Sequence, residues 1–387
     1  MMSNAVYLRV LRAPTTSFFL LGARGVGKST WARLHYAHAR RIDLLDEGLF
    51  QQLLTEPELF AGMLGTVPED GWVVVDEVQR IPGLLNEVHR FIEERRLRFA
   101  LLGSSARKLK TAGTNLLAGR ALWKTMLPLV PEELGDAFDL ERALRFGTIP
   151  LVWAAEDPRA TLEAYVQLYL REEIRSEALV RNLPGFARFI PIAALFHGQS
   201  INVSAIARDS GNARTTISGH LDILEDTLLA WRLEAFEARL RVRERKHPKL
   251  YWIDPGLVRA VKRQLGPVGA EERGALLEGW VHTLLRVYRQ ERELFEDLHY
   301  WSPLQARGVE VDFLLRRGGD LLALEVKAAR TFSRSQLAGL KAIAGLPNVV
   351  RRILVYTGPH QLKVADGVEV WPVQRLLEAL AEDRLWP

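Results

Sequence analysis

The chain has 387 residues, 48% hydrophobic and 26% charged, which is an ordinary composition for a globular protein of several domains. It has no cysteine, which excludes disulfides, thiolate zinc sites and cysteine catalysis. No apolar run reaches the roughly 18 residues of a membrane helix and the first residues lack a signal-peptide pattern, so we expect a cytoplasmic protein without a membrane partner. Its formal net charge of +5 mildly favours the binding of polyanions.

A glycine-rich loop follows the first strand expected in the chain, residues 17–21, and leads into a segment of helix-forming composition. The pattern G-x-x-x-x-G-K-S in this context indicates a phosphate-binding loop, because backbone N–H groups and a helix N-terminus favour negative charge. Lys28 is expected to reach the β- and γ-phosphates of ATP, and Ser29 to bind Mg²⁺. The predicted nucleotide-binding residues are Gly22, Ala23, Arg24, Gly25, Val26, Gly27, Lys28, Ser29 and Thr30.

Two acids end a second apolar strand, residues 72–76, and complete the expected ATP site. Asp76 is predicted to hold Mg²⁺ through water and Glu77 to activate the attacking water. Ser104, after a third strand at 98–102, is either a sensor of the γ-phosphate or part of a serine-rich turn. Arg120 either stabilises transition-state charge in a neighbouring subunit's site or is a plain surface arginine.

These motifs resemble the AAA+-type ATPases that carry a C-terminal DUF4143 domain. The matching stretches are residues 22–29, 76–79, 103–105, 117–120, 127–129, 146–150 and 165–173. The resemblance implies an α/β fold class: a P-loop AAA+ ATPase core at 1–135, a helical lid at 136–190, a winged helix at 191–255, and a restriction-endonuclease-like α/β domain at 256–387. It also implies ATP and Mg²⁺ as cofactors and a homo-oligomer, for which a hexameric ring is favoured.

A helix–turn–helix pattern spans residues 203–224 and is followed by two strands that flank a strongly basic segment, residues 239–249. This layout favours a winged helix that binds DNA, with phosphates held by the basic tip. The alternative is a winged helix that only packs between subunits. The predicted DNA-binding residues are Arg214, Thr215, Thr216, Ser218, Arg241, Arg243, Arg245 and Lys246, and His220 is expected to face the same groove.

Near the C-terminus, Asp312 lies on one expected strand, and Glu325 and Lys327 share a face of the next because side chains alternate along strands. The order helix, strand, hairpin resembles the restriction-endonuclease-like fold, in which Asp…Glu-x-Lys is the active-site signature. Asp312 and Glu325, joined by Glu278 from the preceding helix, are predicted to bind Mg²⁺, and Lys327 to position the attacking water. The alternative is a retained fold that does not cut.

The leading hypothesis is therefore an ATP-dependent DNA-processing protein, in which ATP hydrolysis is coupled to binding, remodelling or translocation of single-stranded or branched DNA. Metal-dependent cleavage would accompany that activity if the C-terminal site is competent. The alternative hypothesis is an ATP-gated regulator or scaffold with a catalytically silent nuclease fold. Agreement among the three regions is the reason for preferring the first.

Overall fold

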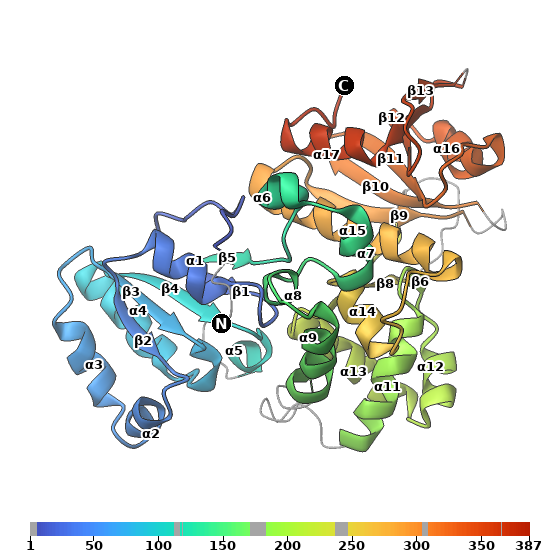
Figure 1. Ribbon diagram of the computed structural model, residues 1–387. Helices are drawn as coiled ribbons and strands as arrows, with labels where there is room; N and C mark the ends of the chain where they lie inside the picture. Colours follow the sequence, from blue (N-terminus) through green and yellow to red (C-terminus); the bar gives the residue numbers. More distant parts are fainter. Residues whose placement is uncertain are drawn as a thin grey trace.

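The computed structural model describes residues 6–111, 117, 119–170, 183–236, 247–303, 309–364 and 366–387. Its N-terminal part is a parallel five-stranded sheet in the order β2-β3-β4-β1-β5 (Figure 1). The strands are β1 (Phe18–Leu21), β2 (Arg40–Asp43), β3 (Trp72–Asp76), β4 (Arg98–Gly103) and β5 (Leu122–Thr125). The helices around them are α1 (Lys28–His35), α2 (Glu47–Thr55), α3 (Glu58–Gly65), α4 (Leu84–Arg95) and α5 (Arg107–Thr111).

The strand order decides which motifs meet. β4 pairs with β1 on one side and with β3 on the other, all in parallel, so their carboxyl ends lie at one edge of the sheet. The glycine-rich loop follows β1, the two acids end β3, and Ser104 follows β4. Ligands of such sheets bind outside the carboxyl ends of the strands, which is where these three segments converge.

The middle of the chain is mostly helical. It begins with α6 (Pro131–Leu134), α7 (Leu140–Phe146), α8 (Pro150–Trp153), α9 (Pro158–Ala164) and a π-helical turn, η3 (Tyr165–Leu170). It continues with α11 (Leu183–Leu195), α12 (Val203–Ser210), α13 (Arg214–Asp226) and α14 (Pro255–Val261). A small antiparallel sheet in the order β6-β8-β7 accompanies these helices, with β6 (Gln199–Ser200), β7 (Ala230–Leu233) and β8 (Lys249–Trp252). The two helices expected between residues 203 and 224 are therefore present as α12 and α13.

The C-terminal part is a mixed six-stranded sheet in the order β13-β14-β12-β11-β10-β9. Its strands are β9 (Asp297–Trp301), β10 (Val311–Arg317), β11 (Asp320–Lys327), β12 (Val349–Tyr356), β13 (Leu362–Lys363) and β14 (Glu369–Pro372). Its helices are the long α15 (Ala270–Arg292), α16 (Ala338–Ala342) and α17 (Val373–Ala381). β10 and β11 form the expected antiparallel hairpin, in which Phe313 lies opposite Leu324.

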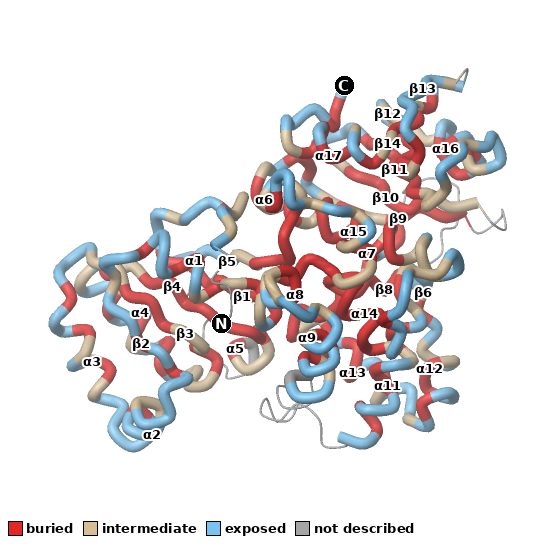
Figure 2. The backbone as a smooth tube through the Cα atoms, viewed as in Figure 1, coloured by how far each residue is buried: buried red, intermediate tan, exposed pale blue. Residues whose placement is uncertain are grey.

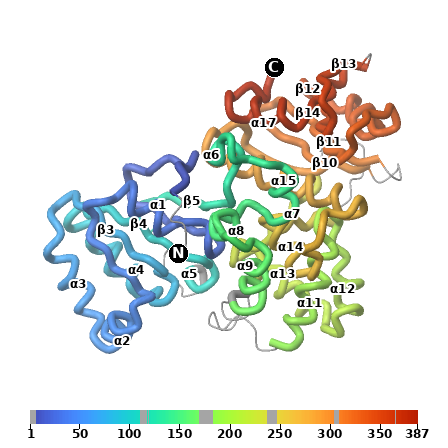
Figure 3. Tube along the Cα trace, viewed as in Figure 1, coloured from blue at the N-terminus to red at the C-terminus, as the bar shows by residue number. Residues whose placement is uncertain are grey.

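One hydrophobic core joins the three parts, which follow one another in chain order in Figure 3. It contains Phe18 of the first sheet, Trp252 of the small sheet, and Trp280 and Trp371 of the C-terminal part. Figure 2 shows the buried backbone running from β1 through α14 and α15 into the last sheet. Polar contacts add to this core: the Gln290 side chain of α15 exchanges two 2.9 Å hydrogen bonds with the Thr125 backbone of β5.

Candidate nucleotide site and C-terminal carboxylate cluster

The glycine-rich loop has the backbone that a phosphate loop requires. Gly25 and Gly27 have φ angles of 78° and 95°, a left-handed conformation that glycine adopts without strain. Gly27 directly precedes Lys28, the first residue of α1. The Lys28 side chain is buried, and its Nζ donates to the carbonyl oxygens of Gly22 at 2.7 Å and Ala23 at 3.4 Å. The predicted phosphate-binding lysine thus lies folded back along its own loop.

Ser29 and Asp76, the two residues predicted to hold Mg²⁺ with ATP, lie near each other, at the start of α1 and the end of β3. Burial raises the pKa of Asp76, and the nearby Ser29 hydroxyl and Lys28 ammonium oppose that effect. A hydroxyl and a carboxylate at the mouth of a phosphate loop are the oxygen donors that Mg²⁺ prefers, so these residues fit the ion.

A second cluster joins Glu77 to the end of β4. The Gln79 Nε2 donates to the Glu77 carboxylate and, at 3.0 Å, to the Ser104 hydroxyl, which itself lies 3.3 Å from Glu77 Oε2. Glu77 has a φ of 55°, a left-handed conformation that is uncommon outside glycine and tends to occur at functional sites. The structure therefore brings the predicted base and the predicted sensor together, with Gln79 between them. Gln79 belongs to the stretch 76–79 that carries the family resemblance, but no role was predicted for it.

Three consecutive carbonyl groups of the loop accept hydrogen bonds from outside the parallel sheet. Arg24 O accepts from the Tyr165 hydroxyl at 3.1 Å, Gly25 O from the Leu151 N–H at 3.2 Å, and Val26 O from the Arg9 guanidinium at 2.8 Å. Tyr165 and Leu151 belong to the helical middle part. Sequence motifs give no signal for these contacts, because the partners are remote along the chain.

Arg120 lies in the turn before β5 with its side chain about two-fifths exposed. Its guanidinium pairs with Glu93 on α4. The structure of one chain therefore shows an intramolecular ion pair, and the expected action of Arg120 in a neighbouring subunit stays a prediction.

The residues predicted to contact DNA divide into two groups. On α13, Arg214, Thr215 and Ser218 are exposed and Thr216 is half-buried. His220 does not face a groove: it is buried against the rings of Phe186 and Phe189, with centroids 4.9 and 5.1 Å away, because it falls on the inner face of the helix. The remaining residues, Arg241, Arg243, Arg245 and Lys246, lie outside the described residues.

In the C-terminal sheet, Asp312, Glu325 and Lys327 meet as the alternation of side chains predicts. Lys327 Nζ lies 2.5 Å from Glu325 Oε1 and 4.0 Å from Asp312 Oδ2. Both carboxylates are also fixed by the backbone of the partner strand, since Asp312 Oδ2 accepts from Val326 N at 2.9 Å and Glu325 Oε2 from Asp312 N at 3.2 Å. Burial and the nearby Asp312 raise the pKa of Glu325.

A second lysine, which sequence reasoning missed, enters the same cluster. Lys249, the first residue of β8, places its Nζ 2.9 Å from Glu278 Oε1 and 3.4 Å from Asp312 Oδ1, and it also pairs with Glu310. The Tyr251 hydroxyl donates to the same Glu278 oxygen. Burial raises the pKa of Glu278, with a further contribution from Asp312. We call Glu278, Glu310, Asp312, Glu325, Lys249 and Lys327 the carboxylate cluster.

The magnesium site predicted from Glu278, Asp312 and Glu325 stays a prediction, because lysines occupy the space between these acids in this structure. Within the described parts of the chain, no group of three or more Asp, Glu or His side chains is arranged to hold a metal ion. Ammonium groups of Lys249 and Lys327 lie against the oxygens that would have to coordinate it. Metal-dependent cleavage at this site stays a prediction.

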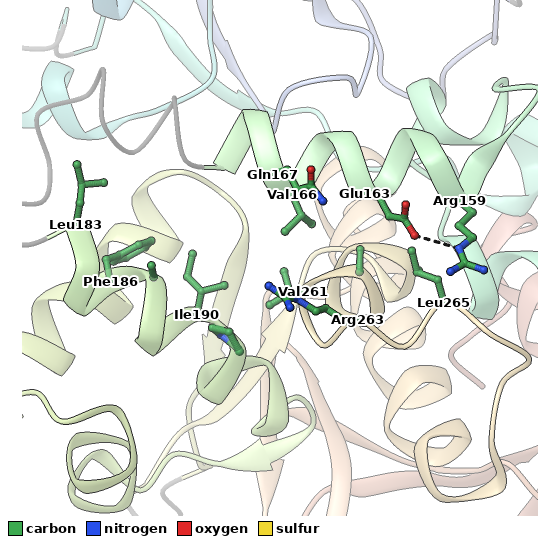
Figure 4. A pocket seen from close by; sticks show the side chains of 13 residues that line it. Arg159, Glu163, Val166, Gln167, Leu183, Phe186, Ile190, Val261, Arg263 and Leu265 are labelled. Atoms are coloured by element: carbon green, nitrogen blue, oxygen red, sulfur yellow. Dashed lines mark hydrogen bonds and ion pairs between the residues drawn. The ribbon is translucent and has the colours of Figure 1, made fainter.

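A cavity in the helical middle part has a lining that shares no residue with the two sites described above. It has a volume of about 520 Å³ and lies between α9, α11 and α14 (Figure 4). Its walls are mainly apolar, with the Arg159–Glu163 ion pair on α9 at one side. None of the predicted site residues lines it.

Among the helices that the structure describes, none is long and apolar enough to cross a membrane.

A parallel sheet whose first strand opens a phosphate loop, and in which the strand beyond its neighbour β4 ends in two acids, defines a nucleotide-binding domain of the AAA type. Residues 15–135 match the family described as AAA domain. Residues 137–267 match a domain of unknown function, DUF8612, and residues 273–376 match another, DUF4143. The chain is thus an AAA-type ATPase-like protein with a C-terminal DUF4143 domain, which confirms the family predicted from the sequence.

Relatives of this chain occur in bacteria. An uncharacterized protein of Mycobacterium tuberculosis is 28% identical over 385 residues, covering 97% of this chain and 83% of that protein. One of Haemophilus influenzae is 23% identical, covering 83% and 79%. Among solved structures, the Aeropyrum pernix ORC1 protein in complex with DNA is 14% identical with a TM-score of 0.25, over 66% of this chain and 87% of that one. A STAND protein of Pyrococcus horikoshii is also 14% identical, with a TM-score of 0.22 over 71% and 45%.

Proposed function

We propose that the chain hydrolyses ATP at the carboxyl edge of its parallel sheet. The observation that carries the proposal is the convergence of Lys28, the Ser29–Asp76 pair and the Glu77–Gln79–Ser104 cluster at one place. These groups come from three different strand ends, and their proximity is what phosphoryl transfer needs. Chance glycine turns do not carry such partners.

Each group has a role that its chemistry allows. Lys28 would leave the carbonyl of Gly22 for the β- and γ-phosphates, and the N-terminus of α1 would add its positive dipole end. Ser29 and Asp76 would hold Mg²⁺, which when bound neutralises charge that develops on the phosphates. Glu77 would accept the proton of the attacking water, held in place through Gln79 and Ser104.

ATP hydrolysis is proposed to serve DNA processing, with single-stranded or branched DNA held by the middle of the chain. In this assignment residues 136–190 form a lid, residues 191–255 a winged helix and residues 256–387 a restriction-endonuclease-like domain. Support comes from the exposed polar residues at the start of α13 and from the basic sequence at 239–246, both suited to phosphate contacts; Lys249, at the end of the predicted basic segment, is buried in the carboxylate cluster instead. A ring, hexameric by preference, would let Arg120 leave Glu93 and act in the neighbouring subunit.

The test combines ATPase assays with DNA binding. Rates are measured for the wild type with single-stranded, duplex and branched DNA, and DNA binding is followed at low and high salt. Glu77→Gln should retain ATP binding and lower kcat by about 100-fold or more, since a general base contributes about that factor. Glu56→Gln, an exposed acid between α2 and α3, is the matched control. An ATPase rate indifferent to every DNA, with no DNA binding at low salt, would refute DNA processing but leave the ATPase intact.

A second candidate function is an ATP-gated regulator, in which nucleotide binding rather than turnover sets the state of the protein. The observation that favours it is the carboxylate cluster, whose acids are paired with lysines instead of being arranged for a metal. Under this alternative, Glu77→Gln should trap an ATP-bound form that still performs the biological function. Loss of that function in a variant that binds ATP and its partners normally would require turnover.

A further inference from the structure

Lys249 is held by three acids at once. Its ammonium has three N–H donors, and its three carboxylate partners are Glu278 on α15, Asp312 on β10 and Glu310 just before β10. The lysine side chain is only 3% exposed, and the ring of Tyr300 lies 5.7 Å from Nζ. Every donor of this buried cation can therefore be satisfied by a carboxylate.

The charges of the carboxylate cluster show why such a cation is needed. Four acids lie together, and besides Lys249 only Lys327 is close to them within the described residues; Lys327 is committed to Glu325 at 2.5 Å. Among the described residues, Lys249 is the only cation that pairs with Glu278 or Glu310, so its removal would take away that partner from both acids. Carboxylates removed from water need either a counter-charge or a proton, and Lys249 supplies the counter-charge at this position.

We infer that Lys249 is the resident cation of the carboxylate cluster, occupying the place at which the predicted metal ion would have to bind. The ion pairs of Lys249 with Glu278, Glu310 and Asp312 then hold the small sheet β6-β8-β7 against α15 and β10. We call these ion pairs the joint between the middle and C-terminal parts of the chain. The joint is independent of ATP hydrolysis. It also accounts for the absence, among the described residues, of any three acids free to coordinate a metal.

The position of Lys249 connects the carboxylate cluster to the small sheet β6-β8-β7 as a whole. β8 is the central strand of its sheet, and Lys249 lies opposite both Ser200 and Leu233. Two residues further on, Tyr251 contacts the same Glu278 oxygen and stacks on His282 of α15 at 4.4 Å. One short strand thus supplies both the cation and a hydrogen-bond donor to the cluster.

The experiment measures Mn²⁺ binding to nucleotide-free protein by electron paramagnetic resonance, together with thermal unfolding. The wild type should bind no Mn²⁺ at the carboxylate cluster. Lys249→Met, which keeps the length of the side chain and removes its charge, should lower Tm by about 5–10 °C and gain one Mn²⁺ per chain, which restores part of the lost Tm. Lys341→Met is the matched control, because this exposed lysine of α16 pairs only with Asp366 in the described structure. It should change neither quantity.

Two double variants separate cation replacement from a general structural defect. Lys249→Met with Glu278→Gln removes one charge of each sign and should fold more stably than Lys249→Met alone, without binding Mn²⁺. Lys249→Met with Asp312→Asn should also lose the Mn²⁺. The inference is overturned if the wild type binds Mn²⁺ and Asp312→Asn abolishes that binding, or if folded Lys249→Met neither loses stability nor gains the ion. If Lys249→Met does not fold, the wild-type titration and the first double variant still decide.

Discussion

Gln79 and Ser104 lie 3.0 Å apart, with the Gln79 amide donating to the serine hydroxyl at the edge where β3 and β4 end. Their contact is buried, and Gly103 leaves room for it, because a Cβ there would lie 2.5 Å from Gln79 Oε1. The same amide donates to Glu77. Gln79 therefore sets the position of the proposed base relative to the proposed sensor.

Replacing Gln79 by Leu should slow hydrolysis more than it weakens ATP binding. The leucine has similar volume but no amide N–H donor, so Glu77 and Ser104 lose the group that holds their side chains in position. Lys28 and Ser29 are unchanged. We expect kcat to fall about 10–100-fold, with KM changed less than about threefold. Steady-state ATPase kinetics measure this split. If KM instead rises by as large a factor as kcat falls, Gln79 acts on ATP binding as well.

Arg9 links the phosphate loop to the helical middle part, and its loss should affect both. Its guanidinium donates to Val26 O at 2.8 Å and to Glu133 Oε1 at 2.9 Å, with both side chains almost completely buried. Arg9→Met leaves the Glu133 carboxylate without its cation, at a cost of about 3 kcal/mol in the free energy of unfolding. Urea denaturation measures that loss, and Arg9→Met with Glu133→Gln should recover part of it. A loss equal in single and double variants would exclude the ion pair as the cause.

Gly279 is the point at which α15 passes closest to His197. A Cβ at this position would lie 2.2 Å from His197 Nε2. Because both residues are buried, the surrounding side chains limit any movement that would relieve this clash. Glycine to alanine inside a helix ordinarily stabilises by about 1 kcal/mol, but here we expect a loss of about 1–3 kcal/mol from overpacking. Gly274→Ala on the same helix, with open space around its Cβ, is the control and should stabilise. Thermal unfolding of the two variants distinguishes the signs.

His197 should make the protein sensitive to acid. Its Nδ1 accepts the Trp252 N–H at 3.1 Å, which requires an unprotonated nitrogen, and burial lowers its pKa from 6.5 to about 3. The unfolded chain therefore binds the proton first, so the contribution of His197 to stability is complete above pH 6.5 and is lost as pH falls toward 3. Between pH 6 and 4 this amounts to about 2.5 kcal/mol.

The measurement is the free energy of unfolding in urea at several pH values. His197→Asn can still accept the Trp252 N–H through its side-chain oxygen, but it does not titrate, so its stability should fall less steeply below pH 6.5 than that of the wild type. His38→Asn, at an exposed position, should keep the wild-type slope. Parallel curves for the wild type and His197→Asn would show that this histidine is not the acid-sensitive group.

The nucleotide site could be read largely from the sequence, because each of its motifs is a short contiguous run tied to the end of a strand. The glycine loop, the pair Asp76-Glu77 and the position of Ser104 were all recognisable, and parallel strands bring their ends to one edge. In the C-terminal part the alternation of side chains correctly brought Asp312, Glu325 and Lys327 together. His220 was misplaced, because a helical pattern alone left its burial against Phe186 undetermined.

Only the tertiary structure decided what surrounds these motifs. Arg9 contacts Glu133, 124 residues away in the sequence, and Lys249 contacts Asp312, 63 residues away. No local sequence pattern predicts either contact. For the C-terminal acids this difference decides the chemistry, since the sequence predicted four charged groups and the fold added two more, Glu310 and Lys249. The sequence by itself determined which side chains stand at strand ends, because the position of each strand and the alternation of its side chains follow from local hydrophobic pattern. Which charges those side chains face depends on how separate parts of the chain pack, and packing is a property of the whole core.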